Sequence, residues 1–193
     1  MAYISFQPSD YFNTVLWTGN SDSDDANQTI TGVGFKPDLF WTKIRNAVDE
    51  HHLRDINLGN TTRLRPNDTA AANTSVCSVV PNSDGFVITG DDGLEFNKDG
   101  NNYVTWNWRG AGSTSSNTDG SVTSTVSANT TAGISIVKWT GTGSNATVGH
   151  GLSTAPRVIY AKNLGTTQNW FVFNKGMYDT DSTAYINFNT TDG

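Results

Sequence analysis

The chain has 193 residues, of which 35% are apolar and 16% are charged, and its net charge is −6 at pH 7. It has no run of lysine or arginine, so a basic surface for nucleic acid is not expected. The single cysteine, Cys77, excludes an intrachain disulfide, and no apolar run approaches the roughly 18 to 20 residues that span a bilayer. The start, MAYISFQPSDYFNT, lacks a basic region and an unbroken apolar stretch, so we do not expect a signal peptide.

The first 110 residues predict a succession of strands and turns. FNTVLW (12–17) alternates apolar and polar residues, and DLFWTKI (38–44) follows Pro37, which suits the entry of a strand. EHHLRDIN (50–57) and the short SVCSVV (75–80) are further strand candidates. DGFVITG (84–90) and KDGNNYVTWNW (98–108) each place a turn before a strand. In the last strand, Val104, Trp106 and Trp108 fall on one face and Tyr103, Thr105 and Asn107 on the other.

Two stretches of the sequence follow the same order of residues. Residues 16–45 and residues 138–163 each run Trp-Thr-Gly, a polar stretch, Gly-x-Gly, Pro and then an apolar run containing Lys. Trp17 aligns with Trp139 and Pro37 with Pro156, so the offset is near 120 residues. This spacing predicts a duplicated module.

The predicted fold is all-β, with tandem antiparallel β-sandwich units of the jelly-roll type and an incomplete second unit. The expected organisation is an N-terminal docking segment (1–13), unit one (14–110), a Gly/Ser/Thr linker (111–133) and a partial unit two (134–193). Within the linker, SVTSTVSA (121–128) could form an edge strand. Unit two has no counterpart of the YVTWNW strand. We therefore expect either a longer native chain or strands supplied by another chain.

Candidate binding residues are few. DEHHLRD (49–55) contains His51 and His52, which would point to opposite faces of a strand and would not converge on a metal. The simpler interpretation is a loop entering a strand with solvated charges. DSDD (22–25) and NKDGNN (97–102) suggest calcium, but Gly and the closing Glu are misplaced, so we interpret both as turns. No metal and no cofactor are predicted.

The sequence gives no positive signal for catalysis. It has no GxSxG motif, and its two glutamates are Glu50 and Glu95. GVG (32–34) and GHG (149–151) precede strands, so no helix N-terminus is expected to bind phosphate. The tryptophans on strand faces are expected to pack, while Trp41 and Trp170 are expected to be exposed and could stack on a sugar. No catalytic residue is predicted, and an enzyme is not expected.

Five phrases resemble a known family: YISFQPSDYFNTVLWTGN, TGVGFKPDLFWTKIRN, SDGFVITG, NYVTWNW and HGLSTAPRVIYAKN. The chain resembles bacteriophage virion proteins of the DUF7483 type, which occur in marine phages and cyanophages and are often labelled tail fibre. The resemblance covers nearly the whole chain and transfers no catalytic residue. Members of this family run on past a second unit that ends in a tyrosine-rich strand.

This resemblance implies a structural and adhesive virion protein that is assembled in the host cytoplasm, as part of a tail fibre or appendage in host attachment. A fibre role is compatible with a homo-oligomer, with a trimer as one option, and with a host surface glycan as a ligand. We hypothesise that the N-terminal segment contacts other virion proteins, and the lack of a long apolar run predicts no membrane insertion. Two alternatives stay open, a capsid decoration or head-fibre protein and a carbohydrate-binding module.

Overall fold

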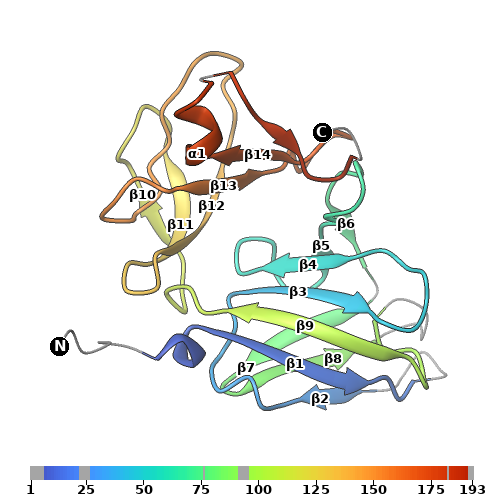
Figure 1. Cartoon of the computed structure of the whole chain (residues 1–193). Helices are drawn as coiled ribbons and strands as arrows, with labels where there is room; N and C mark the ends of the chain where they lie inside the picture. Colours follow the sequence, from blue (N-terminus) through green and yellow to red (C-terminus); the bar gives the residue numbers. More distant parts are fainter. Residues whose placement is uncertain (1–6, 22–26, 76, 91–95, 182, 191–193) are drawn as a thin grey trace.

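The computed structural model describes residues 7–21, 27–75, 77–90, 96–181 and 183–190 (Figure 1). These residues form almost only β-strands, and all the pairings between the strands are antiparallel. The all-β, sandwich-like prediction is confirmed. Within the described residues, no helix has the length and hydropathy needed to cross a bilayer. The acidic stretch 22–25 and Glu95 lie outside the described residues.

The first half of the chain contains a four-stranded sheet in the order β1-β9-β3-β4. Its strands are β1 (Phe12–Thr18), β9 (Asn102–Trp108), β3 (Leu39–Ile44) and β4 (His52–Asp55). β9 is the last of these strands in the sequence, yet it lies in the middle of the sheet and pairs with both β1 and β3. The sheet is therefore completed only when β9 inserts.

A second sheet in the order β2-β8-β7 covers one face of the first (Figure 1). It consists of β2 (Gln28–Ile30), β8 (Gly85–Thr89) and β7 (Ser78–Asn82), and a short pair is formed by β5 (Thr62–Arg63) and β6 (Asn73–Thr74). Apolar side chains fill the space between the two sheets, and Phe40 stacks on Phe86 with ring centroids 5.3 Å apart. The core cluster comprises Ile30, Phe40, Cys77, Val79, Phe86, Ile88 and Phe96.

The alternation predicted for β9 is confirmed, and the structure shows which face is covered. Tyr103, Thr105 and Asn107 are buried toward the core, whereas the face with Trp106 and Trp108 is half-buried. The hydroxyl groups of Thr42 and Thr105 lie 3.0 Å apart inside the sandwich. The buried face of this sheet is thus partly polar, and Asn107 Nδ2 on this face donates to Asn13 O at 3.2 Å and to Thr105 O at 3.0 Å.

The Gly-x-Gly turn after β2 is held by a carboxylate of the same chain. Gly32 and Gly34 have φ of +88° and +84°, a conformation that favours glycine. Their N–H groups donate to the Asp84 carboxylate at 3.1 and 2.7 Å. Asp84 lies in the predicted two-residue turn between β7 and β8. These two hydrogen bonds lower the pKa of Asp84, and they hold the turn after β2 against the β7–β8 turn of the same sheet.

The first strand begins two residues before the expected start of unit one at residue 14. Residues 1–6 lie outside the described residues, a 3₁₀ turn (η1) covers Pro8–Asp10, and β1 already begins at Phe12. The Phe12 ring contacts Trp108 with centroids 5.0 Å apart. Phe12 and Asn13 therefore belong to the sandwich, because they extend the β1–β9 ladder to its end.

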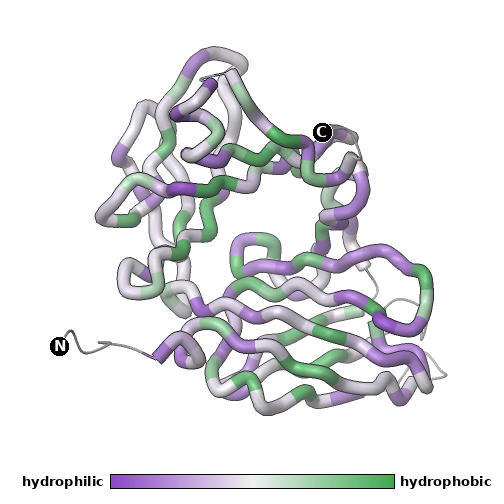
Figure 2. Tube along the Cα trace, in the orientation of Figure 1, coloured by the Kyte–Doolittle hydropathy of each residue, from purple (hydrophilic) through white to green (hydrophobic). Residues whose placement is uncertain are grey.

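The second half contains two separate three-stranded sheets, β10-β11-β12 and β13-β14-β15. Their strands are β10 (Ser115–Asn117), β11 (Ser124–Asn129), β12 (Ile134–Trp139), β13 (Val158–Ala161), β14 (Phe171–Asn174) and β15 (Ile186–Asn187), and a short helix, α1 (Lys175–Tyr178), follows β14. The predicted linker 111–133 is thus not a linker throughout, and its predicted edge strand corresponds to β11, the central strand of its sheet. Apolar residues lie along strands of both halves (Figure 2).

The β3–β4 hairpin and the β13–β14 hairpin have the same pairing register. Leu39 pairs with Asp55 and Trp41 with Leu53, while Val158 pairs with Asn174 and Tyr160 with Val172. Each residue of the second hairpin is numbered 119 above its counterpart in the first. The duplicated sequence is therefore also a duplicated pattern of strand pairing.

Hydrogen bonds around the two hairpins repeat at the same offset of 119. Lys43 Nζ donates to Asp49 O at 3.0 Å, and Lys162 Nζ donates to Gln168 O at 2.6 Å. Asp55 accepts from the N–H of Asn57, and Asn174 accepts from the N–H of Gly176. The N–H groups of Ile56 and Lys175 donate to Asp38 O and Arg157 O, both at 2.8 Å. The repeat therefore extends to the turns that follow β4 and β14.

The duplication supplies a matched pair of substitutions. Phe40 is 3% exposed under the second sheet, whereas its counterpart Ile159 is 43% exposed. Phe40→Ala should cost about 3–5 kcal/mol because it opens a cavity, and Ile159→Ala should cost less than about 1 kcal/mol. Urea unfolding of both variants measures the difference. Equal losses would contradict the two burial environments.

Candidate functional site

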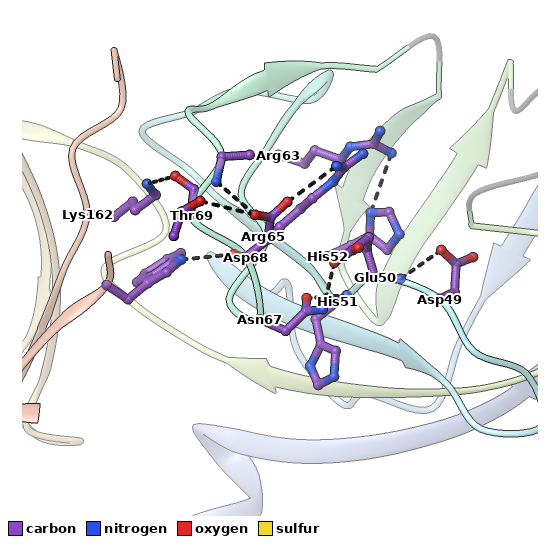
Figure 3. A network of polar contacts seen from close by, with 12 residues as sticks. Asp49, Glu50, His51, His52, Arg63, Arg65, Asn67, Asp68, Thr69 and Lys162 are labelled. Atoms are coloured by element: carbon purple, nitrogen blue, oxygen red, sulfur yellow. Dashed lines mark hydrogen bonds and ion pairs between the residues drawn. The ribbon is translucent and has the colours of Figure 1, made fainter. Parts of the chain in front are cut away.

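The predicted binding residues lie near a contact between the two halves of the chain (Figure 3). The first half contributes the residues before β4, the strands β4 and β5, and the loop 65–69. The second half contributes residues 162–170, which connect β13 to β14. Figure 3 shows the carboxylate, imidazole, guanidinium and amide groups that meet there. We call this region the half-to-half contact.

Trp41 and His51 interact directly. Trp41 Nε1 donates to His51 Nδ1 at 3.0 Å, and the two rings lie 5.7 Å apart. An imidazole nitrogen that accepts a hydrogen bond carries no proton, so this contact requires neutral His51. Partial burial and nearby Lys43 lower the pKa of His51, and Glu50 opposes them. The environment thus favours the form that the hydrogen bond needs.

A chain of short hydrogen bonds holds the residues before β4 in place. The His51 N–H donates to Asn67 Oδ1 at 2.8 Å, and Asn67 Nδ2 donates to Glu50 Oε2 at 2.6 Å. The Glu50 N–H in turn donates to Asp49 Oδ1 at 2.7 Å. The carboxylates of the DEHHLRD stretch thus accept hydrogen bonds from their own chain and do not converge on one point.

Side chains of the second half reach main-chain oxygens of the first. Trp170 Nε1 donates to Arg65 O at 2.9 Å, and Lys162 Nζ donates to Thr69 O at 2.8 Å. The Gln168 N–H also donates to Thr69 O, at 2.9 Å. Burial lowers the pKa of Lys162, and Asp68 opposes this shift. These donors lie in one short connection, so they dock the second hairpin onto the loop 65–69.

The four predicted binding residues do not form one site. Trp41 and His51 meet, but His52 is buried on the opposite face of the strand, 5.7 Å from the ring of Phe96. Trp170 is 5% exposed, so the expectation that it is exposed is wrong. Its indole is buried in the half-to-half contact, where the indole N–H donates to Arg65 O. Two of the four residues are therefore available for a shared surface.

Sequence reasoning did not identify Phe188 and Tyr160 at this contact. The Phe188 ring lies 5.5 Å from Trp41 and 5.5 Å from Tyr160. Tyr160 is the counterpart of Trp41 in the repeated hairpin. The repeat could have indicated Tyr160, whereas nothing local in the sequence places Phe188 between the two rings.

A second contact joins the turn after β4 to β12. Asn57 Nδ2 donates to Ile136 O at 3.2 Å, and Lys138 Nζ donates to Asn57 O at 3.3 Å. Asp55 supports this turn by accepting from the N–H groups of Asn57 and Leu58. Burial raises the pKa of Asp55 to about 6, against the opposing effects of these hydrogen bonds and Lys138. A shallow recess beside this contact is lined by Trp139.

The hydrogen bonds of this region hold chain segments together. Among the residues that the structure describes, no three His, Cys, Asp or Glu side chains lie close enough to hold a metal ion. The NKDGNN stretch forms a turn in which Asn97 Nδ2 donates to Asn20 Oδ1 at 2.9 Å. Side-chain donors of the second half, such as Trp170 and Lys162, hydrogen bond to main-chain carbonyl groups of the first half.

These features define an all-β chain with a repeated antiparallel hairpin. Side-chain donors of the second half bind main-chain carbonyl groups of the first half and hold the two halves together. The sequence matches a family model described as "Domain of unknown function (DUF7483)" over residues 7–193, and the chain therefore belongs to this family. Comparisons with curated proteins and with solved structures give no match. This family membership assigns no function.

The raised pKa of Asp55 predicts how stability changes with pH. The folded state favours protonated Asp55, so this group's stabilising effect is present below about pH 4 and is lost as the pH rises through about 6. Asp55→Asn keeps the accepting oxygen without the charge. It should raise the free energy of unfolding by about 1–3 kcal/mol at pH 8 and leave it unchanged near pH 4. Urea titrations at both pH values measure this.

Asp84→Asn serves as the matched control, because the pKa of Asp84 is shifted the other way. Two N–H donors favour its charged form, so its stabilising effect is present at neutral pH and is lost as the pH falls through its lowered pKa. Asp84→Asn should therefore destabilise the protein at pH 8. If both variants changed stability in the same direction at pH 8, the burial argument for Asp55 would be wrong.

Proposed function

We propose that this chain is a non-enzymatic structural and adhesive component of a phage virion, part of a tail fibre or tail appendage in host attachment. The proposal rests on the resemblance of its phrases to phage virion proteins and on its build from repeated antiparallel β-modules. Repeated strand modules give an extended structure in which each unit contacts its neighbours, which suits an appendage. No step of this proposal requires a cofactor.

The observation that carries the proposal is the exposed apolar surface of the second half. Strands β13 and β14 and the residues around β15 expose large side chains that a self-contained domain would cover. Tyr160, for example, is 56% exposed, while its counterpart Trp41 is only partly exposed. The set comprises Val158, Ile159, Tyr160, Phe171, Tyr185 and Ile186. Such a surface supports association, including a homo-oligomer with a trimer as one option.

Location in the particle tests the proposal. Antibodies to this chain, applied to intact virions and viewed by immunogold electron microscopy, should label the tail. Label on the capsid would favour the alternative of a decoration or head-fibre protein. Absence of the chain from purified particles by mass spectrometry would overturn the proposal. A variant lacking Met1–Phe6 keeps Gln7, whose carbonyl accepts from the N–H of Asp10 in η1, and it keeps β1. It should fold but not incorporate if the N-terminal segment docks the protein.

A carbohydrate-binding module remains the second candidate because one tryptophan is well placed for it. Trp139 is 46% exposed and lines two neighbouring recesses, and an exposed indole can stack on a sugar ring. A glycan array should show binding that Trp139→Ala abolishes. Trp170→Phe is the control, because Trp170 is buried. An array without signal, or equal binding by the Trp139→Ala variant, would remove this candidate.

A further inference from the structure

β9 has a specific role in the first half: it joins two strands that are otherwise apart. Its residues pair along their full length with β1 on one side and with β3 on the other. The ladder continues at both ends, where the N–H of Gly19 donates to Asn101 O and the N–H of Arg109 donates to Tyr11 O. Without β9, β1 and β3 would each present an unpaired edge.

The second half contains the counterparts of β1 and β3 as sheet edges. β12 carries Trp139, the counterpart of Trp17, and β13 is the counterpart of β3 in register. β12 ends the order β10-β11-β12, and β13 begins the order β13-β14-β15. Within the described ranges, no strand pairs with the outer edge of β12 or with that of β13. These are the two edges that β9 joins in the first half.

We propose that β12 and β13 form a receptor for one added β-strand, an extended polypeptide segment with the residue pattern of β9, which pairs antiparallel to both. Strand addition to an exposed sheet edge is an established mode of peptide recognition, in which main-chain hydrogen bonds give affinity and side-chain contacts give specificity. The occupant is a segment of a partner polypeptide that carries this residue pattern. The inference goes beyond the proposed function and does not depend on it.

The main-chain geometry of β13 supports this receptor. Arg157 O accepts from the N–H of Lys175 on the side of β14. Hydrogen-bonding directions alternate along an antiparallel strand, so the main-chain groups of Val158 and Tyr160 point away from β14. The counterpart residues in the first half, Leu39 and Trp41, pair with Trp108 and Trp106 of β9. The outward-pointing main-chain groups of β13 are therefore at the positions that correspond to those of β3 that pair with β9.

The contacts of β9 in the first half define the chemistry of the occupant. Trp17 Nε1 donates to Thr105 Oγ1 at 3.2 Å, and the Trp41 ring lies 5.9 Å from that of Trp106. In the second half, the counterparts Trp139 and Tyr160 are 46% and 56% exposed. A hydroxyl residue followed by an aromatic residue, as in Thr105-Trp106, would cover both. The receptor thus selects a strand that alternates small polar and large apolar side chains.

A tethered strand tests the receptor in the whole chain. A copy of residues 101–109 is fused after Gly193 through a flexible Gly/Ser linker of about 15 residues, which spans roughly 20 Å and gives an effective concentration in the millimolar range. Hydrogen–deuterium exchange is then measured by mass spectrometry. The expected result is slower exchange in both Ile134–Trp139 and Val158–Ala161, at least tenfold relative to the unfused chain.

Two matched controls make the result specific. A fused copy in which the threonine and second tryptophan are replaced by proline should give no protection, because proline removes ladder donors. In the receptor, Val158→Pro should abolish protection while Val158→Ala keeps it, since only the proline removes the edge N–H. Retained exchange protection of the β13–β14 pairing shows that both variants are folded.

Three results of the exchange experiment would overturn the proposal. Unchanged exchange in both strands, or protection of only one of them, would show that the two edges do not act as one receptor. Equal protection by the proline-containing copy would show that contact is not through strand pairing. Protection confined to Phe12–Thr18 and Leu39–Ile44 would show that the fused copy replaces β9 in the first half, which would also count against the receptor.

Discussion

The structure depends on the insertion of one late strand between two early ones. β9 follows β1 by more than 80 residues, yet their pairing and that of β9 with β3 complete the only four-stranded sheet among the described residues. Contacts between residues so far apart in sequence close a long loop, which costs chain entropy before the contacts are gained. The polar groups that β9 brings inside, such as the Asn107 amide, compensate part of this by bonding main-chain carbonyls of β1 and of β9 itself.

The repeat shows how one set of contacts serves two purposes. Lys43 and Lys162 each reach the carbonyl that lies six residues further on, but Lys162 also donates to Thr69 O in the other half. His51 and Trp170 occupy counterpart positions: His51 accepts from Trp41 within its own hairpin, whereas Trp170 donates to Arg65 O across the contact. The imidazole acceptor of His51 is replaced by the indole donor of Trp170 at the counterpart position. The hydrogen bond within one hairpin is thereby replaced by a hydrogen bond between the two halves.

Strand alternation, the turns and the offset near 120 residues were predictable from the sequence, because they depend on neighbouring residues. The buried face of β9 was not, because alternation defines two faces but does not say which one β2, β8 and β7 cover. The same limit applies to Trp170, since the carbonyl that buries it belongs to a loop more than 100 residues away. His51 was a binding candidate from the sequence, but its bond to Trp41 was not predictable, because that bond exists only once β3 and β4 pair. β11 was expected at an edge because its Ser and Thr residues suggest exposure, yet Ser124 and Ser127 are buried between neighbouring segments.

The difference between the halves follows from what covers each hairpin. In the first half Phe40 lies under a second sheet, whereas Ile159 at the matching position is largely exposed. Burying a side chain of that size is worth about 1.5–3 kcal/mol, and an isolated two-stranded hairpin is marginally stable at best. The second half therefore depends on bonds to its neighbour, through Trp170, Lys162 and Asn57, for its place in the fold. An added strand would pair with the edges of β12 and β13 and would cover part of the exposed apolar side chains beside them. The unpaired edges and the exposed apolar residues of the second half can therefore be explained together.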